Sequence, residues 1–166
     1  MKFAITVFPG SNCDHDAYYA LKKNGLKPEF IWHKERNLNR FDGILIPGGF
    51  SYGDYLRTGA IARFSPIMNS VIEQSKKGKI IIGICNGFQI LIESGLLPGI
   101  LLRNKKLKFL SKNVFLKILN FDNKFTSNYN KKNIIQLPIA HNEGNFFANN
   151  YILKNLEDKN LIPFKY

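Results

Sequence analysis

An apolar run that ends in a cysteine between two glycines places the strongest constraint on this 166-residue chain. Residues 80–84 read Ile-Ile-Ile-Gly-Ile and continue directly into Cys85-Asn86-Gly87. Gly83 and Gly87 each lie two residues from Cys85, which is the Gly-x-nucleophile-x-Gly spacing of a sharp turn from a strand into a helix. Such a turn lifts the cysteine out of the sheet and predicts a thiol whose pKa is lowered by the helix N-terminus. The backbone N–H of Asn86 is then placed to serve as an oxyanion donor.

The apolar runs of the first 95 residues alternate with helical patterns. Strands are predicted at 2–8, 26–32, 41–46 and 80–84, with helices that begin at Asn12 or Asp14, at Ser65-Pro66 and just after Cys85. This order predicts an α/β fold of the flavodoxin-like, doubly wound type, a mostly parallel sheet with helices on both faces. Weaker patterns predict strands at 114–119, 134–140 and 161–166 and a helix at 150–159. With no internal repeat and no dividing linker, residues 1–166 are interpreted as one domain.

A second glycine-rich segment follows the predicted strand at 41–46 and begins Pro47-Gly48-Gly49. In an open parallel sheet the carboxyl ends of the strands meet at one edge, so this loop is expected to meet Cys85 there. A nucleophile beside a loop of backbone amides is the arrangement of acyl transfer. The alternative of a phosphate cradle lacks the Lys-Ser/Thr ending of a P-loop. Cys85 as a small buried core residue is the other alternative.

The net charge of +12 raises the question of a nucleic-acid partner, which its distribution does not favour. Residues 1–102 carry +4 and residues 103–166 carry +8. The C-terminal excess is lysine interspersed with asparagine, without an arginine cluster, and favours a solvated surface. Its lysines include Lys105, Lys106, Lys108, Lys112, Lys117, Lys124, Lys131 and Lys132. Two cysteines make no disulfide framework, and no apolar stretch is long enough for a bilayer, so a cytoplasmic protein is expected.

Four segments together carry a family resemblance. They are residues 7–14 (Val-Phe-Pro-Gly-Ser-Asn-Cys-Asp), 47–57 (Pro-Gly-Gly-Phe-Ser-Tyr-Gly-Asp-Tyr-Leu-Arg), 83–89 (Gly-Ile-Cys-Asn-Gly-Phe-Gln) and 138–144 (Pro-Ile-Ala-His-Asn-Glu-Gly). The chain resembles the glutaminase subunits of phosphoribosylformylglycinamidine synthase, which are class I, triad-type glutamine amidotransferases of purine biosynthesis. The resemblance implies that Cys85 is the nucleophile and that Gly49 and Asn86 supply oxyanion amides. It also implies that Gln89 binds glutamine and that Gly48 lets the loop approach.

The same resemblance implies partners but no cofactor or metal in this chain. A large synthetase subunit would receive the ammonia and use ATP and magnesium, and a small subunit would bridge the two. Glutamine would be the substrate, with no nucleic acid and no membrane involved.

The resemblance fails at the general base. The family carries its catalytic histidine and glutamate in a C-terminal His-Pro-Glu motif that nothing here matches, so the domain is expected to be incomplete at its C-terminus. His141-Asn142-Glu143 repeats a His-x-Glu spacing but matches an earlier loop of the family, and a catalytic His141 is not favoured. His15 and His33 are interpreted as surface or packing residues. Two alternatives remain: a catalytically impaired fragment or pseudoenzyme that keeps partner docking, and another elbow-cysteine protein of the amidotransferase-like superfamily.

Overall fold

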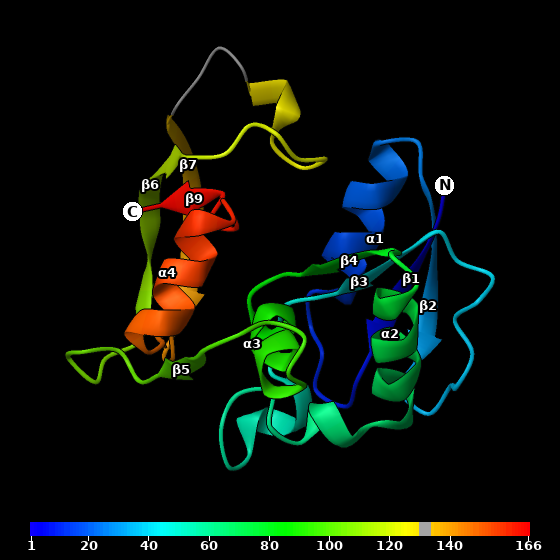
Figure 1. Ribbon diagram of the computed structural model, residues 1–166. Helices are drawn as coiled ribbons and strands as arrows, with labels where there is room; N and C mark the ends of the chain where they lie inside the picture. The colour runs from blue at the N-terminus through cyan, green and yellow to red at the C-terminus, as the bar shows by residue number, and fades with distance from the viewer. Residues whose placement is uncertain (130–133) are drawn as a thin grey trace. The chain divides into compact units, whose positions relative to one another are not determined.

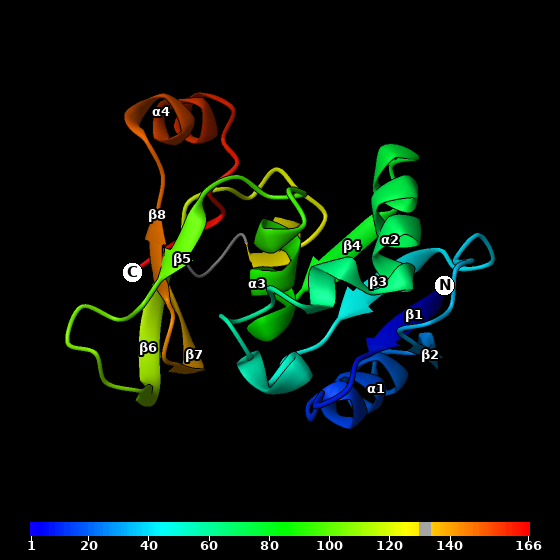
Figure 2. The ribbon, with the colours of Figure 1, turned by 90° about the horizontal axis from the view of Figure 1, so that it is seen from below.

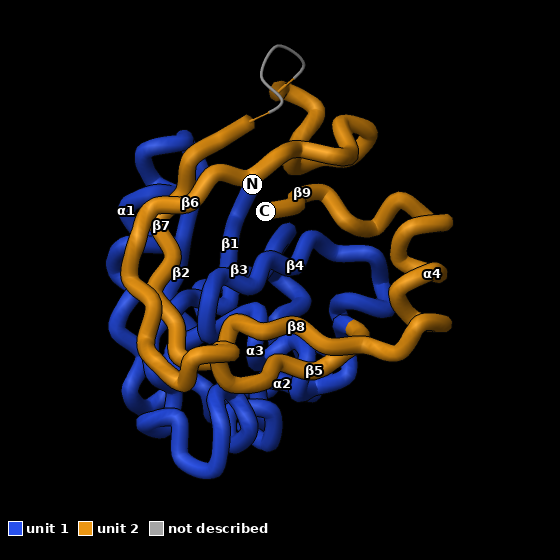
Figure 3. The backbone as a smooth tube through the Cα atoms, turned by 90° about the vertical axis from the view of Figure 1, so that its left-hand side faces the viewer, with its two compact units in different colours: residues 1–97 blue, residues 98–166 orange. Residues whose placement is uncertain are grey.

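The computed structural model describes residues 1–129 and 134–166, which form two compact units, 1–97 and 98–166 (Figure 3). Each unit is described by itself. Lys131 and Lys132 of the predicted lysine-rich surface lie outside the described residues. That residues 1–166 form one incomplete amidotransferase domain stays a prediction.

The first unit is built on a four-stranded parallel sheet. Its strands are β1 (Lys2–Val7), β2 (Lys27–Trp32), β3 (Gly43–Ile46) and β4 (Ile80–Gly83), in the order β2-β1-β3-β4. The register pairs Ile5 of β1 with Phe30 and Leu45, and Ile46 of β3 with Gly83. Because β3 and β4 are parallel neighbours, the loops that follow them begin at the same edge of the sheet. The predicted α/β class and parallel order are confirmed.

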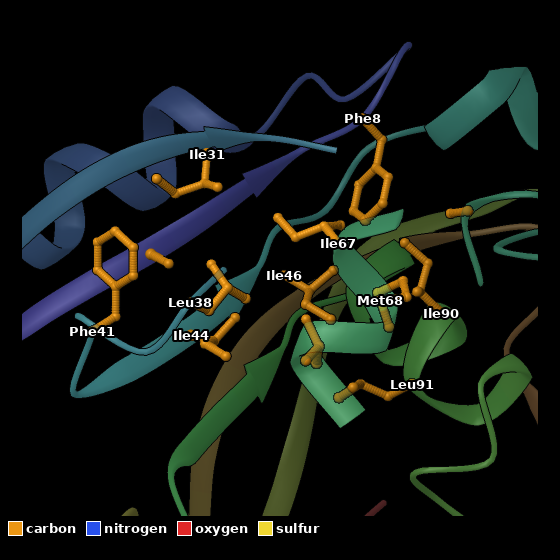
Figure 4. Close-up of a cluster of buried hydrophobic side chains, with 13 residues drawn as sticks. Phe8, Ile31, Leu38, Phe41, Ile44, Ile46, Ile67, Met68, Ile90 and Leu91 are labelled. Carbon is orange, nitrogen blue, oxygen red and sulfur yellow. The ribbon is translucent and has the colours of Figure 1, made fainter. Parts of the chain in front are cut away.

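Helices cover both faces of this sheet, with α1 (Asp14–Lys23) on one side and α2 (Pro66–Lys76) and α3 (Asn86–Glu93) on the other (Figures 1 and 2). Ala17 and Leu21 of α1 are buried against Phe3, Ile5 and Leu45. The opposite cluster (Figure 4) includes Phe8, Leu38, Ile44, Ile46, Ile67, Met68, Ile90 and Leu91. Between β3 and α2 lie a kinked turn at Ser51–Asp54, with positive φ at Tyr52 and Gly53, and a short 3₁₀ helix, Ala62–Phe64. Burial of alternating strand residues against both helix layers accounts for the apolar runs seen in the sequence.

The predicted starts of α1 at Asp14 and of α2 at Ser65-Pro66 are confirmed, but neither helix has a side-chain cap bond. The N-cap of α1 is Cys13, which makes no side-chain cap bond. Asn12 instead accepts a hydrogen bond from the Phe50 N–H at 3.2 Å. Ser65 does lie at the N-cap of α2, but its side chain makes no cap bond either. Asn12 and Ser65 each form a hydrogen bond with a residue distant in sequence and not with the N-terminus of the helix.

The second unit combines antiparallel strand pairs with one helix. β6 (Leu110–Ile118) lies between β7 (Ile134–His141) and β9 (Phe164–Lys165), and β5 (Ile100–Leu102) pairs with β8 (Asn145–Phe147). Two further elements are the 3₁₀ helix Ser127–Tyr129 and α4 (Asn150–Asp158), which is capped by Asn149. β6, β7 and α4 agree with the predicted segments, whereas β5 and β8 were not predicted and β9 is shorter than expected. No helix among the described residues has both the length and the apolar character to cross a membrane.

Leu38 and Leu56 make a matched test of the first unit's core. Leu38 is fully buried, whereas Leu56 is 79% exposed. Leu38→Ala removes buried methyl groups and is expected to lower the free energy of unfolding by about 2–5 kcal/mol. Leu56→Ala is expected to change it by no more than about 0.5 kcal/mol. Chemical denaturation of both variants checks this, and equal losses would contradict the assigned core.

Candidate active site

Cys85 lies at a strained corner between β4 and α3. Its backbone has φ of 52° and ψ of −109°, a conformation that a residue with a Cβ adopts only where its surroundings hold it. The flanking glycines are required sterically. A Cβ on Gly83 would lie 2.6 Å from Leu91 Cδ1, and one on Gly87 would overlap the carbonyl oxygen of Ile46. The helix therefore packs against the strands closely enough to fix the elbow predicted from the sequence.

The glycine-rich loop meets Cys85, as predicted. The Ile84 N–H donates to the Ile46 carbonyl at 3.0 Å, which extends the β3–β4 ladder up to the cysteine. A Cβ built on Gly48 would lie 3.4 Å from Cys85 Cβ and 3.6 Å from Cys13 Sγ. The Gly48 carbonyl in turn accepts from the Cys13 N–H at 3.3 Å. Gly48 thus separates the two cysteines of the chain.

Residues 48–54, called here the oxyanion loop, repeatedly adopt positive φ. The values are 133° at Gly49, 54° at Tyr52, 65° at Gly53 and 53° at Asp54. Tyr52 and Asp54 are not glycines, so this conformation costs energy that contacts elsewhere must supply. Gly49 itself admits no side chain, since a Cβ there would lie 2.6 Å from Asn12 Oδ1.

The side chain of Asn86 joins the oxyanion loop to α3. Its Oδ1 accepts from the Ser51 N–H at 3.1 Å, and its Nδ2 donates to Asp54 Oδ1 at 3.3 Å and to Gln89 Oε1 at 3.1 Å. Asn86 is 2% exposed, so these bonds satisfy a buried amide. The sequence reasoning used only the backbone N–H of this residue and missed both its side-chain role and Asp54. No local sequence pattern predicts the bonds to the oxyanion loop, because Ser51 and Asp54 lie more than 30 positions from Asn86.

The pKa of the Cys85 thiol is raised, contrary to the expectation from its helix N-terminus. Although the residue as a whole is exposed, partial burial of its sulfur raises the pKa most. The Asp54 carboxylate raises it further, while the hydrogen bond from the Asn86 backbone N–H lowers it. Burial outweighs the favourable end of the helix. The thiol is therefore largely protonated at neutral pH and needs a base before it can attack.

The three histidines lie in different surroundings. His15 is exposed and has Nδ1 3.3 Å from the neighbouring Asp14 carboxylate. His33 is buried in the first unit, and its burial lowers the pKa of its ring. His141 belongs to the second unit, where Asn104 donates both amide hydrogens to backbone carbonyls. Asn104 Oδ1 must then accept, so the His141 Nδ1 at 3.0 Å carries a proton.

No group of three His, Cys, Asp or Glu side chains in the described parts of the chain is arranged to hold a metal ion. The chemistry that this arrangement offers by itself is nucleophilic. A cysteine on an elbow faces a backbone N–H at a helix start and lies against a strained, glycine-rich loop.

Comparison with known proteins identifies the family. The model of the CobB/CobQ-like glutamine amidotransferase domain matches residues 1–166. The chain belongs to this family. A solved structure of PurLQS from Thermotoga maritima is 46% identical, with a TM-score of 0.85 over 88% of this amidotransferase chain and 68% of the other.

Two more distant structures support the fold alone. A putative GMP synthase protein from Thermoplasma acidophilum is 18% identical, with a TM-score of 0.61 over 86% of this chain and 66% of that one. A glutamine amidotransferase from Thermotoga maritima is also 18% identical, with a TM-score of 0.60 over 89% and 62%. The amidotransferase chain thus spans about two thirds of the length of these relatives. The fold class and the glutamine amidotransferase resemblance drawn from the motifs are confirmed.

All five residues assigned to the site from the sequence lie in the first unit. Gly48 lies against Cys85, and Gly49 follows it in the oxyanion loop. Asn86 and Gln89 lie in the first turn of α3, and the Gln89 side chain binds that of Asn86. Their individual roles in catalysis stay predictions.

Substitutions at Gly87 and Gly48 test how tightly each glycine of the site is packed. Gly87→Ala forces backbone to move away from the Ile46 carbonyl and is expected to cost about 1–3 kcal/mol of unfolding free energy. Gly48→Ala adds a methyl at ordinary contact distance from Cys85 and is expected to cost clearly less. Denaturant unfolding of the two variants measures the difference. A Gly87→Ala protein as stable as wild type would refute the tight packing of α3.

Asp54 offers a direct test of the electrostatics at Cys85. Its negative charge raises the pKa of the thiol, so Asp54→Asn is expected to move the pH midpoint of Cys85 alkylation downward and to speed alkylation at neutral pH. Iodoacetamide rates measured against pH at the Cys85 peptide report the shift. The matched control is Asp16→Asn, because Asp16 acts on the pKa of Cys13. An unchanged midpoint in Asp54→Asn would contradict the assignment.

Proposed function

We propose that this chain is the glutamine-hydrolysing subunit of a phosphoribosylformylglycinamidine synthase, with Cys85 as its nucleophile. The observation that carries the proposal is the strained elbow, which holds Cys85 between the start of α3 and Gly48. Family membership gives the reaction class, and the 46% identity to a PurLQS structure supports the particular complex.

In the proposed reaction the Cys85 thiolate attacks the side-chain amide carbon of glutamine. A bond forms between sulfur and carbon, and negative charge develops on the amide oxygen, where the N–H groups of Asn86 and Gly49 would stabilise it. The carbon–nitrogen bond then breaks, ammonia leaves with a proton returned by the base, and a glutamyl thioester remains. Water releases glutamate and restores the thiol. One oxyanion donor of this kind typically contributes about 2.7–4 kcal/mol to lowering the barrier.

Because the pKa of the Cys85 thiol is raised, the proposed reaction depends on a base. With its pKa raised by burial and by Asp54, the thiol keeps its proton until a neighbour accepts it. His33 is buried and bound within the first unit, and His15 is turned to Asp14. No histidine in the 166 residues matches the His-Pro-Glu motif of the resembling family. A raised pKa would also limit glutamine hydrolysis while the base is not in place.

The proposed partners follow from the fate of ammonia. A synthetase subunit would take the ammonia into an ATP- and magnesium-dependent amidation of formylglycinamide ribonucleotide, with a small subunit bridging the two. The chain itself would use no cofactor, and the complex would act in the cytoplasm.

Replacement of the nucleophile tests the proposal. In the complex with its synthetase, Cys85→Ser is expected to reduce glutamate release from glutamine by about 10⁴-fold or more, because thioester formation is lost. Cys13→Ser is the matched control, since Cys13 lies across Gly48 from Cys85 but not on the elbow. Mass spectrometry after incubation with glutamine should detect a glutamyl adduct on Cys85 alone.

Two results would overturn it. Undiminished glutamate release by Cys85→Ser would show that another group is the nucleophile. A wild-type complex that assembles without hydrolysing glutamine would favour a subunit that keeps only partner docking.

A further inference from the structure

One of the bonds between the oxyanion loop and the rest of the first unit is made by a phenol. The Tyr52 hydroxyl lies 3.0 Å from His33 Nδ1 and 2.8 Å from Ser65 Oγ. These three residues come from the loop, from the position directly after β2 and from the start of α2. No sequence pattern connects them, and the reaction described above uses none of them.

The two partners of Tyr52 are themselves firmly placed. His33 is 8% exposed, its N–H donates to the Val7 carbonyl at 2.9 Å, and its carbonyl accepts from the Ile67 N–H at 3.0 Å. The rings of Phe8, Trp32 and Tyr52 surround its imidazole. The phenol therefore binds to a fixed point in the core.

Ser65 supplies a second, independent observation. It is 5% exposed and occupies the N-cap of α2, where a serine normally accepts from the helix. Here the hydroxyl makes no cap bond and binds Tyr52 instead. A helix cap contributes about 0.5–2 kcal/mol, so the stabilisation normally available to α2 is given up for the contact with the loop.

The backbone of Tyr52 also adopts positive φ. Its φ of 54° is unfavourable for a bulky residue, and it persists only under constraint. The backbone of Tyr52 is held by a 2.6 Å bond from its N–H to the Pro9 carbonyl, and its side chain by His33 and Ser65. The backbone and the side chain of Tyr52 are thus both held by hydrogen bonds, three positions after Gly49.

We propose that Tyr52 is a positioning residue for the oxyanion hole, and that its hydroxyl, held between His33 and Ser65, keeps the loop strained so that Gly49 stays in place for the oxyanion. The inference rests on the proposed function, because it assigns Tyr52 a part in the same reaction. It does not place Tyr52 in contact with glutamine.

Two alkylating reagents distinguish positioning from general structure. A chloroketone analogue of glutamine presents a carbonyl oxygen to the oxyanion hole while the Cys85 thiolate displaces chloride and forms a carbon–sulfur bond. Iodoacetamide undergoes displacement of iodide by the same thiolate without needing that hole. Tyr52→Phe is expected to slow chloroketone labelling of Cys85 by about ten- to a hundredfold, since displacements of about 1 Å have effects of that size. Its iodoacetamide rate is expected to stay within about twofold of wild type, a margin far below that effect.

The chain offers matched controls. Tyr55→Phe removes a phenol hydroxyl from the neighbouring segment at a residue that is 70% exposed, and should change neither rate. His33→Asn keeps an amide group near the position of Nδ1 and should retain most of the chloroketone rate. His33→Leu, which cannot bind the phenol, should slow chloroketone labelling as Tyr52→Phe does. Thermal unfolding of each variant shows whether it is folded.

The outcomes separate the two proposals. A normal chloroketone rate in folded Tyr52→Phe would overturn the positioning role while leaving Cys85 as the nucleophile of the proposed function. If Tyr52→Phe slowed labelling by both reagents equally, Tyr52 would only maintain the fold, and the positioning role would again be overturned. A wild-type chain whose Cys85 reacts with iodoacetamide but not with the chloroketone would refute the proposed function, and the role of Tyr52 with it.

Discussion

The contact between the first turn of α3 and the end of β3 underlies everything else at the site. Gly87 lies so close to the Ile46 carbonyl that no side chain fits between them, and Gly83 approaches Leu91 and Gly87 in the same way. Close packing of this kind allows little local adjustment, so the residue between the glycines must accept positive φ. The strain at Cys85 is therefore a consequence of helix–strand packing. It fixes the direction of the thiol before any substrate arrives.

A second layer of constraint is polar and acts on the oxyanion loop. Asn86 binds the loop from the side of α3, Asn12 binds it from the segment before α1, and Tyr52 binds it to the core. Each of these bonds joins segments far apart in the sequence. A loop with several residues at positive φ needs such anchoring, because its intrinsic preference is for other conformations. These hydrogen bonds thus stabilise a loop conformation that the glycines only make sterically allowed.

The electrostatics of the site favour the protonated, unreactive form of the Cys85 thiol. Burial and the Asp54 carboxylate keep the Cys85 thiol protonated, against the smaller influence of the Asn86 N–H. A nucleophile of this kind reacts only when a base is aligned with it. For an enzyme that passes ammonia to a partner, this property would couple hydrolysis to assembly of the complete site, in keeping with the proposed function.

Local sequence was enough for the strands and helices of residues 1–95, because apolar periodicity and glycine breaks mark them directly. The same periodicity fails for β5 and β8, since three-residue strands carry too little pattern and form only by pairing with each other. The side-chain bonds of Asn12 to Phe50 and of Ser65 to Tyr52 were also not predicted, although Ser65 lies at the N-cap of α2 as expected. Asn and Ser side chains can make several kinds of hydrogen bond, and the fold decides which partner lies within reach.

The sequence by itself predicted the elbow, because the Gly-x-Cys-x-Gly spacing after an apolar run is typical of a sharp strand–helix turn. The two glycines leave room for the close packing that this corner requires. It also determined that a glycine-rich loop would reach the same edge of the sheet, because strand order fixes which ends are neighbours. Only the tertiary structure decided the ionisation of the thiol and the anchoring of the loop. Both depend on burial and on residues such as Asp54 and His33, whose distances from the site are set by folding and not by their positions along the chain.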